Sequence, residues 1–472
     1  MTKADWSRHE GGAEPRSRQP YTPPPGASSL VSWEAEHGTT FRPDVEGLRS
    51  VAVLLVLVYH AKFGIVSGGF IGVDVFFVLS GYLITALLLR ELATTGTVSL
   101  ANFWARRARR LLPASGVVLL ATLVAGRFML DGLSQGELAR DAIAACLFGA
   151  TIRLWQVGTG YPSEGLRESP PLHSRSLAVG PTLHFWSLAV EEQFYLVWPG
   201  LLMLLVRVAR LSRRTLGAVI GVMWVVSFAA CVKLTHDSQP WAFFMLPARA
   251  WELLTGAALA LAGGRLLRAN RQLVAMLGWL GLGVILACSV QFSQATSFPG
   301  YAALLPVVAT MLVLNAGPAP DGPALILRTK PMQWVGARSY AIYLWHFPML
   351  VLVGAKWGES GRIDALPVAT RIALLLGSVG LAAVSYHFIE NPVRHSRGLS
   401  AVPARSLVMG AWVAIIGVGG AARDNNGNAA YRRTGGPGGR ASREVGRVGR
   451  GGRAADGRQV GRAHQVLGRM GR

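Results

Sequence analysis

The stretch FRPDVEGLRSVAVLLVLVYH, residues 41–60, decides the fold class. Its charged first part extends to Arg49, an apolar run follows, and the stretch ends at His60. In a helix that starts near Leu48, the path from Arg49 to His60 rises about 16 Å, roughly half of a 30 Å hydrocarbon core. We therefore expect Arg49 at one membrane face and His60 near the middle of the bilayer. An ionisable group at that depth indicates a functional site, and a histidine that only packs against a neighbouring helix is the alternative.

The composition of the whole chain favours a membrane protein. Of 472 residues, 51% are hydrophobic and only 15% are charged. Repeated long apolar runs predict an all-α, polytopic transmembrane helical bundle of about 10–11 spans, with disordered N- and C-terminal tails. The expected spans lie near 49–66, 72–89, 111–128, 184–206, 215–234, 247–263, 272–290, 302–316, 335–354, 369–389 and 404–420.

Arginine-rich and uncharged connections alternate along these spans. Arg or Lys follows spans two, four, six, eight and ten, whereas the connections 67–71, 235–246 and 291–301 carry neither. Because cytoplasmic loops are enriched in Arg and Lys, the pattern predicts a multi-pass membrane protein with its N-terminus in the cytoplasm. The apolar segment 142–155 is short, and a full crossing there would invert all later loops. We expect it to be re-entrant or interfacial, on the outer side.

The sequence divides into four parts. Residues 1–40 are polar and predict a disordered cytoplasmic leader, residues 41–395 form the main membrane domain, and residues 396–420 add one further span. Residues 421–472 are rich in Gly and Arg, which predicts a disordered tail or, alternatively, the product of a shifted reading frame. This tail and the cytoplasmic loops explain the formal net charge of +22 without a nucleic-acid partner. No CxxC pair occurs, so neither a disulfide nor a metal site is expected.

Asp74 opens the second span, in GGFIGVDVFFVLSGYLIT. The neighbouring glycines allow helices to approach closely, so we expect Asp74 to orient His60 or to bind its cation from the next helix. An ordinary helix cap on a tight outer turn is the alternative interpretation.

Two adjacent glutamates lie inside the fourth span, in HFWSLAVEEQFYLVWP. On a helix, His184, Ser187 and Glu191 share one face, whereas Glu192 faces elsewhere, toward Tyr195. Buried carboxylates are costly, which favours a catalytic role over a structural one. A carboxylate beside a neutral histidine is the usual arrangement for general-base catalysis.

Further polar groups occur in later spans. In SYAIYLWHFP, Tyr343 and His346 share a face with the serine at position 339. Arg249 and Glu252 lie one turn apart, and an internal salt bridge explains them. The segment 390–394, ENPVR, indicates mainly a helix terminator.

The segment FWARRARRLLP places Arg106, Arg107 and Arg110 just before the third span. Anchoring at the cytoplasmic face explains such a cluster. The alternative is a phosphate-binding patch for a nucleotide-like cofactor, because guanidinium groups bind phosphate through two hydrogen bonds. The sequence contains neither a Walker A motif nor a Rossmann glycine fingerprint.

Seven segments, in order, resemble the integral-membrane acyltransferase family 3. They are RPDVEGLRSVAVLLVLVYH, GVDVFFVLSGYLIT, FWARRARRLLP, HFWSLAVEEQFYLVWP, RAWELLTG, YAIYLWHFP and HFIENPVR, and the resemblance covers roughly residues 41–395. Members of this family include O-acetylases of lipopolysaccharide, peptidoglycan and other cell-surface glycans.

The resemblance implies transfer of an acyl group, usually acetyl from acetyl-CoA, to a sugar hydroxyl across the membrane, without a metal. The family's essential arginine and histidine match Arg49 and His60, and its acidic pair matches Glu191 and Glu192. Its arginine motif matches Arg106, Arg107 and Arg110, which favours contact with the CoA phosphates. We expect Asp74 to assist catalysis, and Arg49, His184, Tyr343 and His346 to support the substrate or the structure.

The chain departs from the family in one respect. Many members with an eleventh span continue into an extracytoplasmic SGNH-type domain, and nothing after Leu407 matches that domain. We expect either a truncated, inactive protein or one that depends on a separate SGNH-type partner. The acceptor would be a lipid-linked or periplasmic glycan. A polytopic transporter is the alternative from a different functional class, because transporters also place charges at the bilayer midplane.

Overall fold

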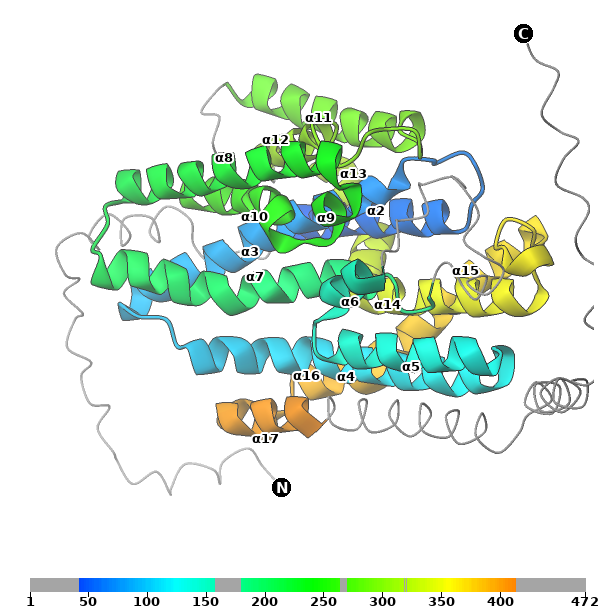
Figure 1. The fold of residues 1–472 in the computed structure, drawn as a ribbon. Helices are drawn as coiled ribbons and strands as arrows, with labels where there is room; N and C mark the ends of the chain where they lie inside the picture. Colours follow the sequence, from blue (N-terminus) through cyan, green and yellow to red (C-terminus); the bar gives the residue numbers. More distant parts are fainter. Residues whose placement is uncertain (1–41, 158–179, 264–269, 318, 320, 413–472) are drawn as a thin grey trace, which may run out of the picture.

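The computed structural model describes residues 42–412 except for 158–179, 264–269, 318 and 320. Within these residues the chain is built of helices and contains no strand, which confirms the all-α prediction (Figure 1). Six helical segments in this part are long and apolar enough to cross a bilayer, so the protein is a multi-pass membrane protein. The predicted leader 1–40 and tail 421–472 lie outside the described residues.

The principal helices of the described part correspond to the first ten predicted spans. They are α2 (Pro43–His60), α3 (Gly72–Thr95), α4 (Leu100–Met129), α7 (Phe185–Met203), α8 (Arg213–Asp237), α10 (Leu246–Leu261), α11 (Arg271–Gln291), α12 (Leu304–Ala316), α14 (Lys330–Trp357) and α15 (Val368–Ser385). Of the eleventh predicted span, 404–420, residues up to 412 are helical and the remainder lies outside the described residues.

Shorter elements connect or extend these helices. They are η1 (Gly69–Ile71), α5 (Gly132–Cys146), α6 (Ala150–Val157), η2 (Leu204–Val208), α9 (Gln239–Phe244), α13 (Ala324–Leu327), η3 (Glu359–Gly361), η4 (Tyr386–Glu390), α16 (Asn391–Arg394) and α17 (Arg397–Ala401).

Helix α2 is positioned differently from the prediction. It begins at Pro43, and Arg42 donates a hydrogen bond of 2.8 Å to the hydroxyl of Tyr82, which lies near the middle of α3. Arg49 therefore lies on the second turn of α2 and is half-buried. His60 is the last residue of α2, so it lies at a helix end and not part-way along a helix that extends to residue 66.

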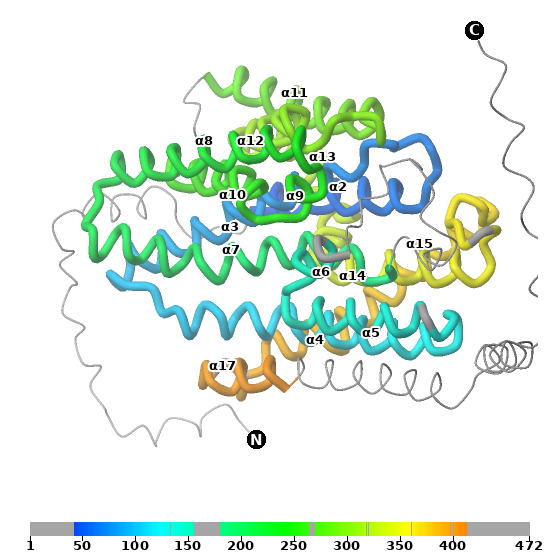
Figure 2. Tube along the Cα trace, viewed as in Figure 1, coloured from blue at the N-terminus to red at the C-terminus, as the bar shows by residue number. Residues whose placement is uncertain are grey.

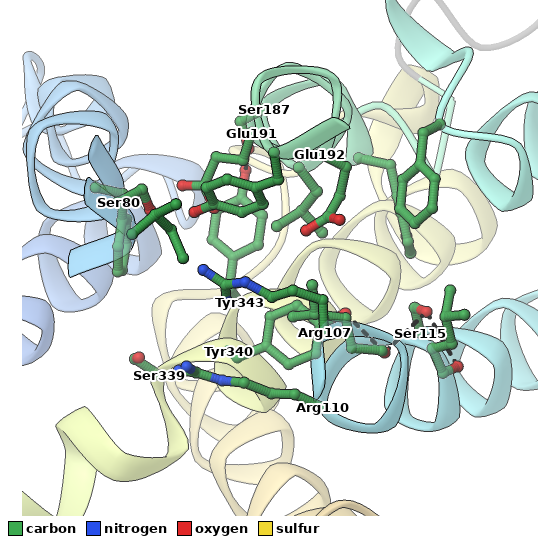
Figure 3. Close-up of a pocket in the computed structure, with 18 of the residues that line it drawn as sticks. Ser80, Arg107, Arg110, Ser115, Ser187, Glu191, Glu192, Ser339, Tyr340 and Tyr343 are labelled. Atoms are coloured by element: carbon green, nitrogen blue, oxygen red, sulfur yellow. Dashed lines mark hydrogen bonds between the residues drawn. The ribbon is translucent and has the colours of Figure 1, made fainter. Parts of the chain in front are cut away.

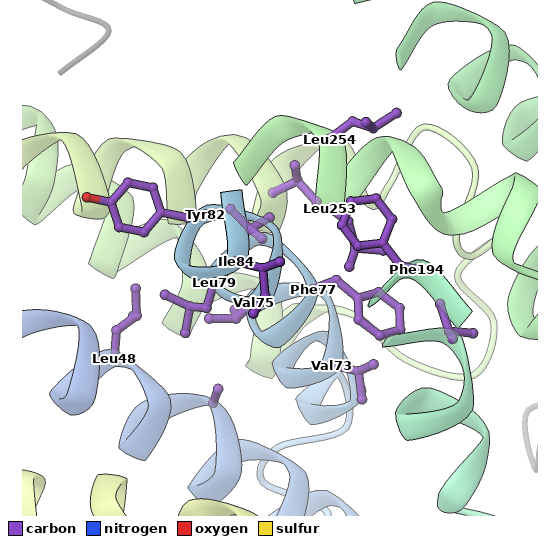
Figure 4. Close-up of a cluster of buried hydrophobic side chains, with 14 of the residues drawn as sticks. Leu48, Val73, Val75, Phe77, Leu79, Tyr82, Ile84, Phe194, Leu253 and Leu254 are labelled. Atoms are coloured by element: carbon purple, nitrogen blue, oxygen red, sulfur yellow. The ribbon is translucent and has the colours of Figure 1, made fainter. Parts of the chain in front are cut away.

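Helices α3 and α10 approach each other through facing glycines. A side chain on Gly81 would collide with the backbone of Leu253, and one on Gly256 would collide with the backbone of Val78. Small residues allow such close packing in membranes, where lipid gives no hydrophobic driving force between helices. Figure 4 shows the buried apolar core around this crossing.

The segment 142–155 forms parts of the helices α5 and α6. Helix α5 has 15 residues, which gives a length of about 22 Å, too short for a 30 Å hydrocarbon core. It lies beside α4 (Figure 2), where Leu138 contacts Gly126. Gln193 of α7 donates hydrogen bonds to the Phe148 carbonyl (3.2 Å) and to Thr151 (3.1 Å). The segment thus comprises the end of one short helix and the start of another, both packed on the bundle, and neither is among the helices long enough to cross a bilayer.

Candidate functional site

A cavity of about 500 Å³ lies among α2, α3, α4, α7 and α14 (Figure 3). One part of its wall is apolar, and the other part carries charged and hydroxyl groups. The polar lining residues are Arg49, Ser80, Arg106, Arg107, Arg109, Arg110, Ser115, Ser187, Glu191, Glu192, Tyr195, Ser339, Tyr340, Tyr343, Arg394 and His395.

The two glutamates come from the middle of α7, and both line this cavity. The hydroxyl of Tyr195 donates to Glu191 Oε2 at 3.3 Å, because a tyrosine four residues on lies one turn away on the same helix face. Glu192, predicted to face Tyr195, also lies near that residue, but the hydrogen bond is made to Glu191. Ser80 of α3 supplies a second hydroxyl beside the Glu191 carboxylate (Figure 3).

The arginines of α4 surround one end of the cavity but have different partners. Arg106 forms an ion pair of 3.1 Å with Glu91, and Arg109 donates to Ser406 Oγ at 2.7 Å. The guanidinium of Arg107 lies over the Tyr195 ring, 4.3 Å from its centre. Figure 3 shows Arg107 and Arg110 extending into the cavity below the glutamates.

A second, very small cavity of about 10 Å³ lies at the end of α2. His60 and His184 line it together with Val73, Tyr343 and the aromatic residues Phe70, Trp186 and Phe347. His184 directly precedes α7, and neither of its ring nitrogens has a hydrogen-bond partner in the described part of the chain. The structure thus brings His60, His184 and His346 together, with ring centres 5.2 Å apart for His60 and His346 and 5.8 Å apart for His184 and His346.

The contact of His60 with His346 sets the tautomers of both rings. His346 Nδ1 lies 3.3 Å from the Ile342 carbonyl oxygen, which only accepts, so this nitrogen carries the proton. In a neutral pair, His346 Nε2 then accepts from His60 Nδ1, at 3.1 Å. This order places the lone pair of His60 on Nε2, which is the form needed for a base or a nucleophile.

Two side chains, Val73 and Tyr343, line both cavities. The hydroxyl of Tyr343 lies 2.7 Å from Ser187 Oγ and donates to the His184 carbonyl oxygen at 3.0 Å. Of the face predicted on α7, Ser187 and Glu191 line the large cavity and His184 the small one. Val73 and Tyr343 therefore form part of the wall between the glutamates and the histidines.

Asp74 does not orient His60 in this structure. Its Oδ1 accepts from Arg249 Nη2 at 3.0 Å, and Arg249 Nη1 lies 3.0 Å from Glu252. The close packing of α3 on α10 brings the residues together, and the predicted pair of Arg249 and Glu252 is therefore a triad. Glu191 likewise is bonded to Tyr195 and not to His60, so His346 occupies the position expected for an acidic partner.

The end of α2 is held by a residue that the sequence did not single out. Arg371 of α15 donates through Nη1 to the carbonyl oxygens of Ala61 (2.9 Å) and Lys62 (2.7 Å). The ammonium of Lys62 lies 4.6 Å from the centre of the Tyr59 ring. Burial lowers the pKa of Lys62, and the nearby Asp364 opposes that shift.

Arg394 belongs to the segment ENPVR, which the sequence indicated to be mainly a helix terminator and not part of a site. It lines the large cavity from α16. The sequence did contain a signal for such a role, because Arg394 lies one helical turn after Glu390. A helix terminator requires the proline of ENPVR but not this arginine. Among the described residues, no group of three or more His, Cys, Asp or Glu side chains could hold a metal ion.

The arrangement suits transfer of a small group from a large anionic donor. Arginines at one end of a roomy cavity favour a phosphorylated ligand, and the enclosed imidazoles beyond Tyr343 offer a base or nucleophile in a site with little room for water. The glutamates lie between these two regions.

Comparison with known proteins gives a consistent result. Residues 42–387 match a family model described as an acyltransferase domain. The peptidoglycan O-acetyltransferase OatA of Listeria monocytogenes is 30% identical over 395 residues, which are 80% of this chain and 61% of that protein. The O-acetyltransferase OatA of Staphylococcus aureus is 31% identical over 376 residues, 76% of this chain and 58% of that protein. YrhL of Bacillus subtilis is 33% identical over 365 residues, 75% of this chain and 55% of that protein.

The chain therefore spans between 55% and 61% of the length of these curated relatives. No solved structure matches it significantly.

Proposed function

The chain belongs to the acyltransferase family whose domain model it matches, and from this membership we propose that it is a membrane O-acetyltransferase of the cell envelope. It moves an acetyl group from acetyl-CoA to a hydroxyl of peptidoglycan or another envelope glycan. The observation that supports this function best is the arginine-rich cavity, which shares two lining residues, Val73 and Tyr343, with the small cavity lined by His60 and His184.

The donor enters the large cavity from the cytoplasmic side of the bacterial inner membrane. The positive-inside pattern of the connections supports this orientation, with the N-terminus in the cytoplasm. The CoA phosphates bind the arginine end of the cavity, where Arg107 and Arg110 extend inward, with Arg106 at the margin. The thioester then points past Glu191 and Glu192 toward Tyr343.

The chemistry takes place at His60, where two routes are open. In the first, His60 Nε2 accepts the proton of the acceptor hydroxyl while that oxygen attacks the thioester carbon. The carbon–sulfur bond breaks, and the proton passes to the sulfur, which leaves as CoA. In the second, Nε2 itself attacks the thioester carbon, CoA leaves, and the acetyl group is passed on to the hydroxyl. In both routes His346 keeps the lone pair of His60 on Nε2.

The acceptor approaches at the opposite end, where α2 ends. It is a lipid-linked or periplasmic glycan, and a separate SGNH-type protein completes the transfer where the final acceptor is polymeric. The names of the Listeria and Staphylococcus relatives support a wall glycan as the acceptor.

The test uses membranes that contain the protein and acetyl-CoA labelled in the acetyl group. The wild type is expected to release CoA and to transfer label to glycan. General acid–base catalysis contributes about 10²–10⁴-fold, so His60→Ala should lower turnover by at least about 100-fold. His346→Ala should lower turnover by less, because His60 keeps its position but loses the acceptor that fixes its tautomer.

The matched control is His387→Ala, because His387 is an exposed histidine outside both cavities. Its turnover should equal that of the wild type. Wild-type turnover in His60→Ala would remove His60 from the mechanism. Movement of an unaltered substrate without release of CoA would identify a transporter instead.

A further inference from the structure

The four arginines of FWARRARRLLP are not equivalent once the helix is folded. Arg106 is neutralised by Glu91, and Arg109 is turned away to donate to Ser406 Oγ and to the Leu399 carbonyl (3.2 Å). Arg110 is different: its Nε, like that of Arg109, is buried without a hydrogen-bond partner among the described residues, but no other atom of its guanidinium group forms a hydrogen bond or ion pair there either. A buried hydrogen-bond donor without a partner costs free energy. A bound anion would therefore stabilise Arg110 by accepting hydrogen bonds from its guanidinium group.

Two arginines from other helices line the same cavity as Arg110. They are Arg49 of α2 and Arg394 of α16, and both lie close enough to Arg110 to repel it. None of the three forms an ion pair with an acidic side chain within the described part of the chain. Guanidinium groups that line one cavity repel one another, and an anion bound between them offsets that repulsion.

Carboxylates lie near this cluster but make no direct contact with it. Glu390 attracts Arg49, Arg110 and Arg394, yet its Oε2 is buried without a hydrogen-bond partner in the described residues. Glu191 lies near Arg49 and accepts from Tyr195, and Glu192 lies near Arg107 and Arg110. Since none of these carboxylates forms an ion pair with the three arginines in the described part of the chain, the guanidinium donors remain available to a ligand.

We propose that Arg110, Arg49 and Arg394 form an anion subsite that binds phosphate groups of the CoA-type donor, and that Arg394 is a donor-binding residue. This inference rests on the proposed function. It assigns different roles to the arginines of the FWARRARRLLP motif. Arg110 binds the ligand together with two arginines far away in the sequence, whereas Arg106 and Arg109 hold the protein together. Guanidinium groups that line one cavity suit a diphosphate, since each can donate two parallel hydrogen bonds.

The test compares two donors that carry the same thioester. Acetyl-CoA carries phosphate groups, and acetyl-pantetheine carries none. The full chain is purified in nanodiscs of zwitterionic lipid, and KM is measured for each donor. Arg394→Gln is expected to raise KM for acetyl-CoA about tenfold or more, as expected for the loss of a hydrogen bond between charged groups, and to leave KM for acetyl-pantetheine unchanged. Arg394→Lys should give an intermediate value.

The control is Arg90→Gln, which removes the same charge from an exposed arginine that lines neither cavity. Its KM for acetyl-CoA should change less than about threefold. An Arg394→Gln protein that behaves like Arg90→Gln would overturn the subsite, as would an equal rise in KM for both donors. If Arg394→Gln does not fold, Arg394→Lys has to show the same selectivity for acetyl-CoA, and its absence overturns the proposal.

Direct binding separates the subsite from the proposed function. Wild-type protein that does not bind CoA in nanodiscs would contradict acetyl-CoA as the donor. If, in addition, the protein binds anionic lipid and Arg394→Gln removes that binding, the subsite holds a lipid headgroup, which also overturns the assignment. Binding of CoA by the wild type and a loss of at least about tenfold in Arg394→Gln is the result that supports both.

Discussion

Asp74, Arg249 and Glu252 form a buried triad with one cation and two carboxylates. The side chains of Arg249 and Asp74 are 1% and 0% exposed. Four aromatic rings surround the guanidinium, with centres 5.3–5.9 Å from its carbon: Phe77, Trp186, Phe243 and Phe298. This environment favours a cation, so the triad stabilises the crossing of α3 and α10.

The triad contains one positive and two negative groups, so substitutions of its members should reduce the stability of the protein by different amounts. Arg249→Gln leaves two buried carboxylates without a cation and should cost about 3–5 kcal/mol. Asp74→Asn leaves one arginine and one carboxylate, and it should cost clearly less. Thermal unfolding of the purified proteins in detergent, followed by circular dichroism, measures both losses.

Glu252→Gln is the matched control, since it also leaves a single ion pair. Equal destabilisation by Asp74→Asn and Arg249→Gln would contradict this account. A loss of turnover in Asp74→Asn at unchanged thermal stability would instead support a catalytic role for Asp74.

The partners of individual residues could be predicted from the sequence only in part. Arg249 and Glu252 lie one turn apart, so their ion pair could be predicted from spacing. Asp74 joins them from a distant segment because Gly81 and Gly256 bring two helices together, and spacing within one segment does not contain that information. His60 and His346 are likewise brought into contact by the packing of α14 on α2.

At the scale of elements, helix positions could be predicted well and their ends less well. Apolar runs determine where helices lie. In lipid, backbone N–H and C=O groups have no water to bind, so an apolar segment has to satisfy them internally as a helix. The end of α2 at His60 depends on other interactions. Lys62 adopts a positive φ of 55°, and Arg371 binds the carbonyl oxygens that follow the helix. Such a distant partner leaves no pattern in residues 41–60.

Arg371 fixes the end of α2 and therefore the position of His60. We expect Arg371→Gln to lower kcat about tenfold or more while KM for acetyl-CoA changes little, because the large cavity is not lined by Arg371. Arg371→Lys should recover part of the activity, since an ammonium can still donate to one carbonyl oxygen. Steady-state kinetics in nanodiscs provide both parameters.

Arg362→Gln serves as the control for this prediction. Arg362 is exposed in the neighbouring connection and binds Asp364 through Nε at 3.0 Å. A rise in KM with unchanged kcat in Arg371→Gln would show that the residue acts on the donor and not on His60.

At the scale of the whole molecule, the two ends of the bundle differ in charge. At one end α3 meets the end of α7, where Arg207 donates to the Gly96 carbonyl at 2.5 Å, and Arg210, Arg213 and Arg214 follow. At the other end α3 begins, and Ser67 donates to the Phe292 carbonyl at 2.6 Å. The connection 292–303 at that end carries no Arg or Lys. This contrast follows from the sequence alone, because it depends on composition and not on packing.

The contrast predicts which end faces the cytoplasm, and single cysteines can test it. Ala101 lies exposed at the start of α4, beside the arginine-rich end, and Ala295 lies exposed in the connection 292–303. In a background without Cys146, Cys231 and Cys288, Ala295→Cys should react with a membrane-impermeant maleimide in intact cells. Ala101→Cys should react only after permeabilisation, because positively charged loops are retained in the cytoplasm.

The same experiment determines from which side the donor enters. The arginines that line the large cavity from α4 are Arg106, Arg107, Arg109 and Arg110, within ten residues of Ala101. If Ala101→Cys is labelled only in permeabilised cells, these arginines lie toward the cytoplasm, where CoA is made. His60 then lies toward the outer face, where the glycan is found. The reverse labelling pattern would put the arginine end outside the cell, and a cytoplasmic acetyl-CoA could then not reach it from that end.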